Sequence, residues 1–95
     1  MRVIFSARSL RDLTAIIETI AADDPRAART FSAEVKRRCA LLAVTPEMGR
    51  ERPDVGVGVR SLVEGNYLIF YRPMLDAGRV NILSIWHGRR QLPRL

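Results

Sequence analysis

The chain has few of the residues that build redox and metal sites. Its 95 residues include one cysteine, Cys39, and one histidine, His87. One cysteine cannot form an internal disulfide, and this pair cannot supply the ligands of a structural zinc site. Cys39 falls in a helical pattern, so we expect a small core residue rather than a reactive thiol. We expect no metal and no other cofactor.

Long hydrophobic runs are also missing. No apolar stretch approaches the roughly 20 residues that a helix needs to cross a bilayer. The first residues, MRVIFSARSLRDL, lack the apolar core of a signal peptide. The apolar share of 47% is ordinary for a globular protein and too high for a disordered one. We therefore expect one cytoplasmic domain, residues 1–95, that does not bind membranes.

Acidic residues are scarce, and their scarcity is uneven. The chain has 16 basic and 10 acidic residues, a net charge of +6, and Lys36 is the one base that is not arginine. Beyond Asp76 no acid occurs, whereas four arginines do: Arg79, Arg89, Arg90 and Arg94. Such a tail favours phosphate groups or an acidic protein partner.

The first half of the chain predicts two helices. Ser6 is a suitable N-cap for the first, whose apolar stripe is Leu10, Leu13, Ile17 and Ile20. Asp12 and the other polar residues between them are expected to face water. Asp24 and Pro25 begin a second helix, which ends before Thr45-Pro46. Because the break between them is short, the two helices form an antiparallel hairpin.

The second half predicts strands. After a loop rich in proline and glycine, 46–58, side chains alternate over 59–64, and Gly65-Asn66 makes a hairpin turn. The apolar run 67–71, YLIFY, suits a central strand buried on both faces, and 80–86 forms the last strand. With a short strand at 2–5, the predicted fold is α+β: a helix hairpin packed on one face of a three-stranded antiparallel meander.

Three phrases of the sequence carry a family resemblance. They are ARSLRDLTAIIETI, LLAVTPEMGRERPDVGVGVRSLVEGNYLIFYRP and VNILSIWHGRR. In this order they resemble the RelE/ParE superfamily of toxins from bacterial toxin–antitoxin pairs, most closely the ParE branch. The resemblance implies a toxin held inactive by a cognate ParD-like antitoxin, in a complex that can assemble into a larger hetero-oligomer. It also implies one of two targets: ParE-like members poison DNA gyrase, and RelE-like members cut messenger RNA on the ribosome.

The residues fit a complete ribonuclease site poorly. The ribonuclease alternative uses Arg60, His87 and Arg89. The resemblance to RelE-like enzymes implies that His87 and Arg89 lie near catalytic positions of that family, and Arg60 is added as a phosphate-binding residue within the sheet. However, Tyr67 stands where the strand arginine of those enzymes lies, and Leu95 stands where a terminal tyrosine would be. Losing one member of a cooperating catalytic set usually removes most of the rate. We therefore favour a toxin that is not an enzyme, with ribonuclease as the alternative.

A target-binding surface is predicted at the end of the last strand. Trp86, His87, Arg89 and Arg90 are its expected contacts, because tryptophan and arginine often anchor interfaces, and Arg60 supports them. His87 can instead bond the backbone, or act as a base oriented by Glu64. Arg60 can bind phosphate, or anchor the preceding loop through Asp54 or Glu51.

The antitoxin is expected to cover apolar residues that so small a domain leaves exposed. The candidates are Ile16, Ile17 and Ile20. Acidic residues in the antitoxin would complement the net charge of +6. The main hypothesis is a gyrase poison neutralised by this partner. The alternatives are a ribosome-dependent ribonuclease, and an inactive toxin fold that only binds the antitoxin.

Overall fold

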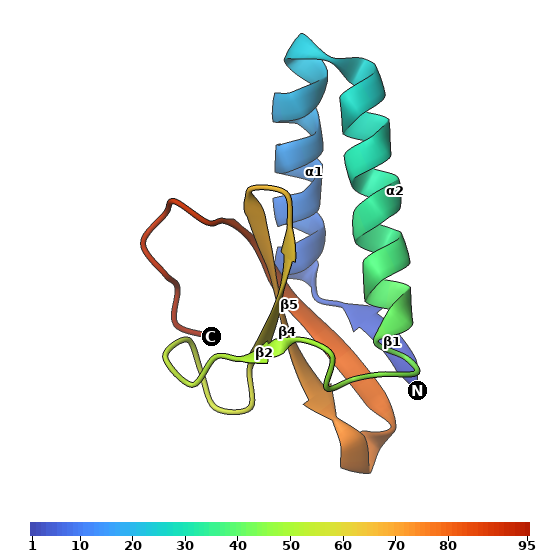
Figure 1. Ribbon diagram of the computed structural model, residues 1–95, viewed down its shortest axis with the longest axis vertical. Coiled ribbons are helices and arrows are strands. Elements are labelled where there is room, and N and C mark those ends of the chain that lie inside the picture. The colour runs from blue at the N-terminus through green and yellow to red at the C-terminus, as the bar shows by residue number, and fades with distance from the viewer.

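A mixed sheet and a helix hairpin make up the structure, a computed structural model that describes residues 1–95 (Figure 1). The helices are α1 (Ala7–Asp23) and α2 (Pro25–Leu41). The strands are β1 (Arg2–Phe5), β2 (Arg50–Glu51), β3 (Arg60–Glu64), β4 (Tyr67–Met74) and β5 (Arg79–His87), and the short turn η1 (Leu75–Ala77) joins the last two. The order across the sheet is β1-β5-β4-β3-β2, with β1 parallel to β5 and the other neighbours antiparallel.

Both helices begin where the sequence predicts. The Ser6 side chain accepts a hydrogen bond from the backbone N–H of Ser9, and the Asp24 carboxylate accepts from Arg26 and Ala27. These bonds satisfy backbone groups that the first turn of a helix leaves unpaired. The hairpin projects beyond the sheet, and its closed end points away from it (Figure 1). α2 ends at Leu41, a few residues earlier than expected, and a turn fills the interval before Pro46.

The predicted α+β fold is confirmed, with three differences in the sheet. The expected loop 46–58 contains the two-residue strand β2, which is too short to show alternation in the sequence. The N-terminal strand pairs with β5 in parallel, so the sheet is mixed. β4 continues through Pro73, which lacks a backbone N–H. Proline is tolerated there because β3 pairs with β4 only as far as Tyr71, which leaves that edge of β4 open.

The two faces of the sheet bury separate apolar clusters. The larger cluster lies beneath the helices and consists of Leu13, Val35, Cys39, Leu42, Leu62, Ile69, Tyr71, Val80, Ile82 and Ile85. The smaller cluster consists of Val55, Val59 and Phe70, with Leu68, Leu83, Trp86 and Leu95 against it. Neighbouring residues of β4 thus belong to opposite clusters. This confirms the prediction that the run YLIFY is buried on both faces.

The loop before β3 and the C-terminal tail cover the smaller cluster. The backbone N–H of Leu95 donates to the carbonyl of Val55 at 2.8 Å, and Arg72 donates to the carbonyl of Val57 at 2.9 Å. A Cβ at Gly56 would lie 2.1 Å from the Leu95 carbonyl oxygen, so only glycine permits this approach. Figure 1 shows the tail end beside this loop.

Asp12 joins α1 to the C-terminal half of β5. β1 pairs with β5 only as far as Ile82, and side chains from the start of α1 bond the residues beyond it. One carboxylate oxygen of Asp12 accepts from the Ser84 hydroxyl at 2.6 Å and from the Ile85 N–H at 3.0 Å. The prediction that Asp12 faces water was therefore wrong. Helical spacing places Asp12 beside the apolar stripe but cannot show that a strand edge lies within its reach.

Tyr71 provides a second buried polar link. Its hydroxyl accepts a hydrogen bond from the backbone N–H of Gly49 at 2.7 Å, and both residues are buried. Burial raises the pKa of the Tyr71 hydroxyl above its usual value. The bond ties the segment after α2 to the centre of the sheet.

Replacing Asp12 should cost stability. In Asp12→Ala the Ser84 hydroxyl and the Ile85 N–H lose their acceptor, so we expect the free energy of unfolding to fall by about 2 kcal/mol. Glu18→Ala on the same helix removes an exposed carboxylate without a partner and should change it by about 0.5 kcal/mol or less. Urea unfolding of both variants gives the comparison, and equal losses would show that Asp12 is not a structural link.

Replacing Tyr71 tests the second link. Tyr71→Phe leaves the buried Gly49 N–H unpaired and should lower the free energy of unfolding by roughly 1–3 kcal/mol. Tyr67→Phe, in the same strand, is the matched control because its hydroxyl makes no hydrogen bond within the chain, and its effect should stay near zero. Thermal unfolding followed by circular dichroism measures both, and an unchanged Tyr71 variant would contradict the proposed role.

Candidate functional site

The C-terminal end of β5 brings a tryptophan together with two arginines. Trp86 pairs with Leu68 of β4 and is half-buried. The guanidinium carbon of Arg90 lies 3.8 Å from the centre of its ring, and that of Arg8 lies 5.6 Å from it. The indole N–H donates to the carbonyl of Gln91 at 3.1 Å. Trp86 thus contacts the smaller apolar cluster and is flanked by cations.

His87 takes part in the turn that follows the strand. Its Nδ1 accepts a hydrogen bond from the Arg89 N–H at 3.0 Å, and its carbonyl accepts from the Arg90 N–H at 3.0 Å. The ring stands edge-on to Tyr67, with 5.1 Å between ring centres. Of the three interpretations of His87, the geometry favours the one in which the histidine bonds the backbone.

Glu64 does not orient His87. It pairs with Tyr67 of β4, and Tyr67 pairs on its other side with His87, so a whole strand lies between the two residues. The Glu64 carboxylate instead lies 3.6 Å from the guanidinium of Arg38. A general base at His87 would therefore lack the carboxylate that usually fixes an imidazole.

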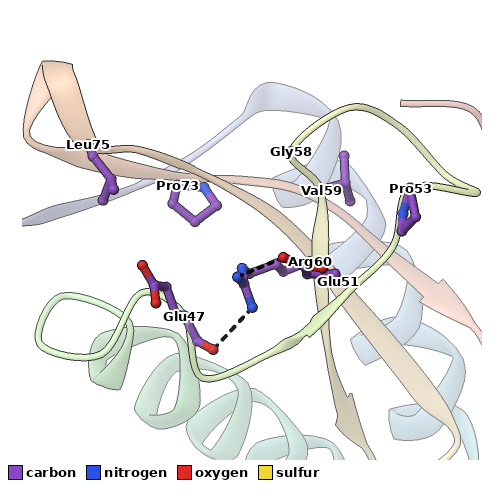
Figure 2. A pocket seen from close by; sticks show the side chains of 8 residues that line it. All are labelled: Glu47, Glu51, Pro53, Gly58, Val59, Arg60, Pro73 and Leu75. Carbon is purple, nitrogen blue, oxygen red and sulfur yellow. Dashed lines mark hydrogen bonds and ion pairs between the residues drawn. The ribbon is translucent and has the colours of Figure 1, made fainter.

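Arg60 anchors the loop before β3, which is one of the two roles that the sequence predicts for it. It donates to the carbonyls of Gly49 and Glu47 at 2.8 and 3.2 Å, and to the carboxylate of Glu51 at 3.3 Å. The other predicted partner, Asp54, is paired with Arg52. Figure 2 shows Arg60 pointing across an open hollow of about 390 Å³ toward Glu47.

The structure does not bring Arg60 to His87 and Arg89. Arg60 pairs with Tyr71, whereas His87 pairs with Tyr67, four residues away on the same strand. At the usual rise of a strand this places them about 13 Å apart along the sheet, with β4 between them. Arg89 is exposed and lines a small hollow with His87 and Tyr67. The expected ribonuclease set is therefore split between two ends of the sheet.

The predicted antitoxin contacts lie on α1, and the last residue of the chain packs against the sheet. Ile16, Ile17 and Ile20 are all half-buried, and the first two pack against the larger cluster. Ile17 also lines an apolar hollow between α1 and α2, together with Ala21 and Ala28. Leu95, at the position where a terminal tyrosine would stand, packs against the smaller cluster.

The cations at the end of β5 have no carboxylate partners. The four ion pairs of the chain are Arg37–Glu34, Arg38–Glu64, Arg52–Asp54 and Arg60–Glu51. None involves Arg8, Arg89 or Arg90, nor the other arginines beyond Asp76. Sequence reasoning missed Arg8. The available signal was its place in the first turn of α1, which holds no acidic residue although acids are favoured there.

The residue types that ligate metals are scattered over the chain, and the one thiol is buried. No group of three or more histidine, cysteine, aspartate or glutamate residues is arranged to hold a metal ion. Cys39 is buried, and burial raises the pKa of its thiol to about 12. None of the helices combines the length and apolar character needed to span a membrane.

Cys39 should react only when the chain unfolds. A disulfide reagent near neutral pH should label the native protein very slowly and the urea-unfolded protein quickly. The absorbance of the thiolate that the reagent releases records the rate. Rapid labelling of native protein would show that Cys39 is accessible.

The same burial predicts a loss of stability at high pH. The unfolded thiol has a pKa near 9.0 and the folded thiol a pKa of about 12, so the free energy of unfolding should fall as the pH rises through this interval.

Comparison with known proteins identifies a family and a shared fold. A family model described as "ParE toxin of type II toxin-antitoxin system, parDE" matches residues 3–92. A solved chain described as "Chromosomal ParDE TA system from P. aeruginosa" superposes with a TM-score of 0.77. The two are 21% identical, and the alignment covers 92% of this chain and 95% of that one, so the likeness shows a shared fold. No curated protein matches in sequence.

Proposed function

Because the chain belongs to the ParE toxin family of type II toxin–antitoxin systems, we propose that it arrests bacterial growth by poisoning DNA gyrase. The observation that carries the proposal is the end of β5, where Trp86 stands beside Arg89 and Arg90. Neither arginine has a carboxylate partner within the chain, so both are available to a target. Partly buried tryptophan and arginine are the residue types that most often dominate binding energy at interfaces.

The geometry supports binding more than catalysis. Cleavage of RNA by its own 2′-hydroxyl needs a base to take a proton and a cation to stabilise the phosphate. His87 uses Nδ1 to accept a backbone hydrogen bond, and no carboxylate orients it. Arg60 already donates to three acceptors at the other end of the sheet. A toxin that acts by contact, without a catalytic set, fits this arrangement best.

A ParD-like antitoxin is the proposed partner that neutralises the toxin. The apolar hollow between α1 and α2, with Ile17 in its wall and Ile16 and Ile20 nearby on α1, offers a groove for an apolar segment. Acidic residues around such a segment would be attracted by the net charge of +6 and would speed association. A segment of the antitoxin that folds on binding can lie along the projecting helix hairpin. The resulting toxin–antitoxin complex can then assemble into a larger hetero-oligomer.

Arginine replacements at the end of β5 test the target. In a gyrase assay that reads supercoiled product and cleaved DNA on one gel, the wild-type chain should inhibit and trap cleaved DNA. Arg89→Ala with Arg90→Ala should raise the inhibitory concentration about tenfold or more, the loss expected when interface anchors are removed. Arg2→Ala with Arg26→Ala removes the same charge from exposed sites elsewhere and should leave inhibition nearly unchanged.

The gyrase assay and two further measurements in cells separate the competing functions. Added antitoxin should restore supercoiling. If a large excess of folded wild-type chain leaves gyrase unaffected, the gyrase target is wrong. Codon-phased cuts in messenger RNA after induction would then identify a ribonuclease, and harmless overexpression would identify a fold that only binds antitoxin.

A further inference from the structure

Two arginines from opposite ends of the chain flank one tryptophan ring. Arg8 comes from the first turn of α1, and Arg90 comes from the tail after β5. The Ser6 hydroxyl donates to the Leu83 carbonyl, and the Asp12 carboxylate accepts from Ser84 and Ile85. These bonds hold the start of α1 against β5 and so place Arg8 there. We refer to Arg8, Trp86 and Arg90 as the Arg–Trp–Arg cluster.

This arrangement places two cations on one ring, and neither of them has an ion-pair partner. Arg8 lies in the first turn of a helix, where the backbone N–H groups already carry partial positive charge and a cation is disfavoured. Arg90 adds a second cation on the same ring, and neither forms an ion pair. The nearest acid along α1, Asp12, directs its carboxylate to β5. An external anion would relieve this repulsion.

We propose that the Arg–Trp–Arg cluster binds phosphate groups of duplex DNA. Two guanidinium groups held by one ring suit this task, because arginine binds phosphate oxygens through paired hydrogen bonds. The inference rests on the proposed function, since gyrase holds a DNA duplex while it is poisoned. The chain then contacts the DNA of the gyrase complex as well as the enzyme.

The cluster suits a DNA backbone better than an acidic protein. None of the four main hollows on the surface is lined by Arg8, Trp86 or Arg90, so none of them can seat the anchoring side chain of a peptide at this cluster. Arg90 already stacks on Trp86, with 3.8 Å between guanidinium carbon and ring centre, and a single-stranded base would have to displace it. A row of phosphates needs only the exposed charges.

Binding of a short labelled duplex tests the inference. Fluorescence anisotropy at several salt concentrations should show binding by the full chain, and emission of Trp86, the one tryptophan, should change with it. Arg8→Ala with Arg90→Ala should weaken binding. It should also make the negative slope of log affinity against log salt shallower by about two, one for each lost phosphate contact. Arg8→Lys with Arg90→Lys should keep most of that slope.

Controls separate this inference from the proposed function. Arg2→Ala with Arg26→Ala, matched in charge, should change the slope much less than the cluster variant, and equal changes in both would overturn the inference. Cluster-dependent binding of poly-glutamate without DNA binding would also overturn it, by assigning the surface to an acidic protein. Gyrase inhibition without cluster-dependent DNA binding removes the inference alone. Cluster-dependent DNA binding without gyrase inhibition supports it and removes the gyrase target.

Discussion

The carboxylate of Asp12 is the link on which the arrangement of helices and sheet depends. β5 needs partners along its whole length, but β1 reaches only Ile82, and unpaired N–H groups at a buried edge are costly. Asp12 and Ser6 satisfy the groups beyond that point and hold the first turns of α1 against the strand. These bonds help to place Arg8, in the first turn of α1, beside Trp86.

The sheet then separates two tasks between its faces. Ile69 and Tyr71 of β4 face the core under the helix hairpin, and Phe70 faces the smaller cluster under the loop and tail. The larger cluster stabilises the fold, whereas the smaller one fixes segments that have no secondary structure of their own. The positively charged end of the chain is therefore held against the sheet by apolar contacts around Phe70 and by the Leu95–Val55 hydrogen bond.

The sequence predicts what depends on local pattern. Helix caps at Ser6 and Asp24, the YLIFY strand and the order of elements all follow from residue type and spacing. Asp12 and Arg8 were misplaced or missed because their partners lie more than 70 residues away along the chain, at Ser84 and Trp86. The separation of Arg60 from His87 depends on strand register, which alternation alone cannot fix. Family resemblance predicted where the candidate contacts lie along the chain but not which of them lie together.

The close approach of Gly56 to Leu95 has a consequence for how the chain opens and closes. The Leu95 carbonyl fits only against a loop that carries no side chain at position 56, so the docked tail and the shape of the loop depend on each other. Because the tail and loop pack on the smaller cluster and not on the core beneath the helices, they can open together as a local unit while that core stays intact. Each time this unit opens, the arginines of the tail are released from the sheet with it.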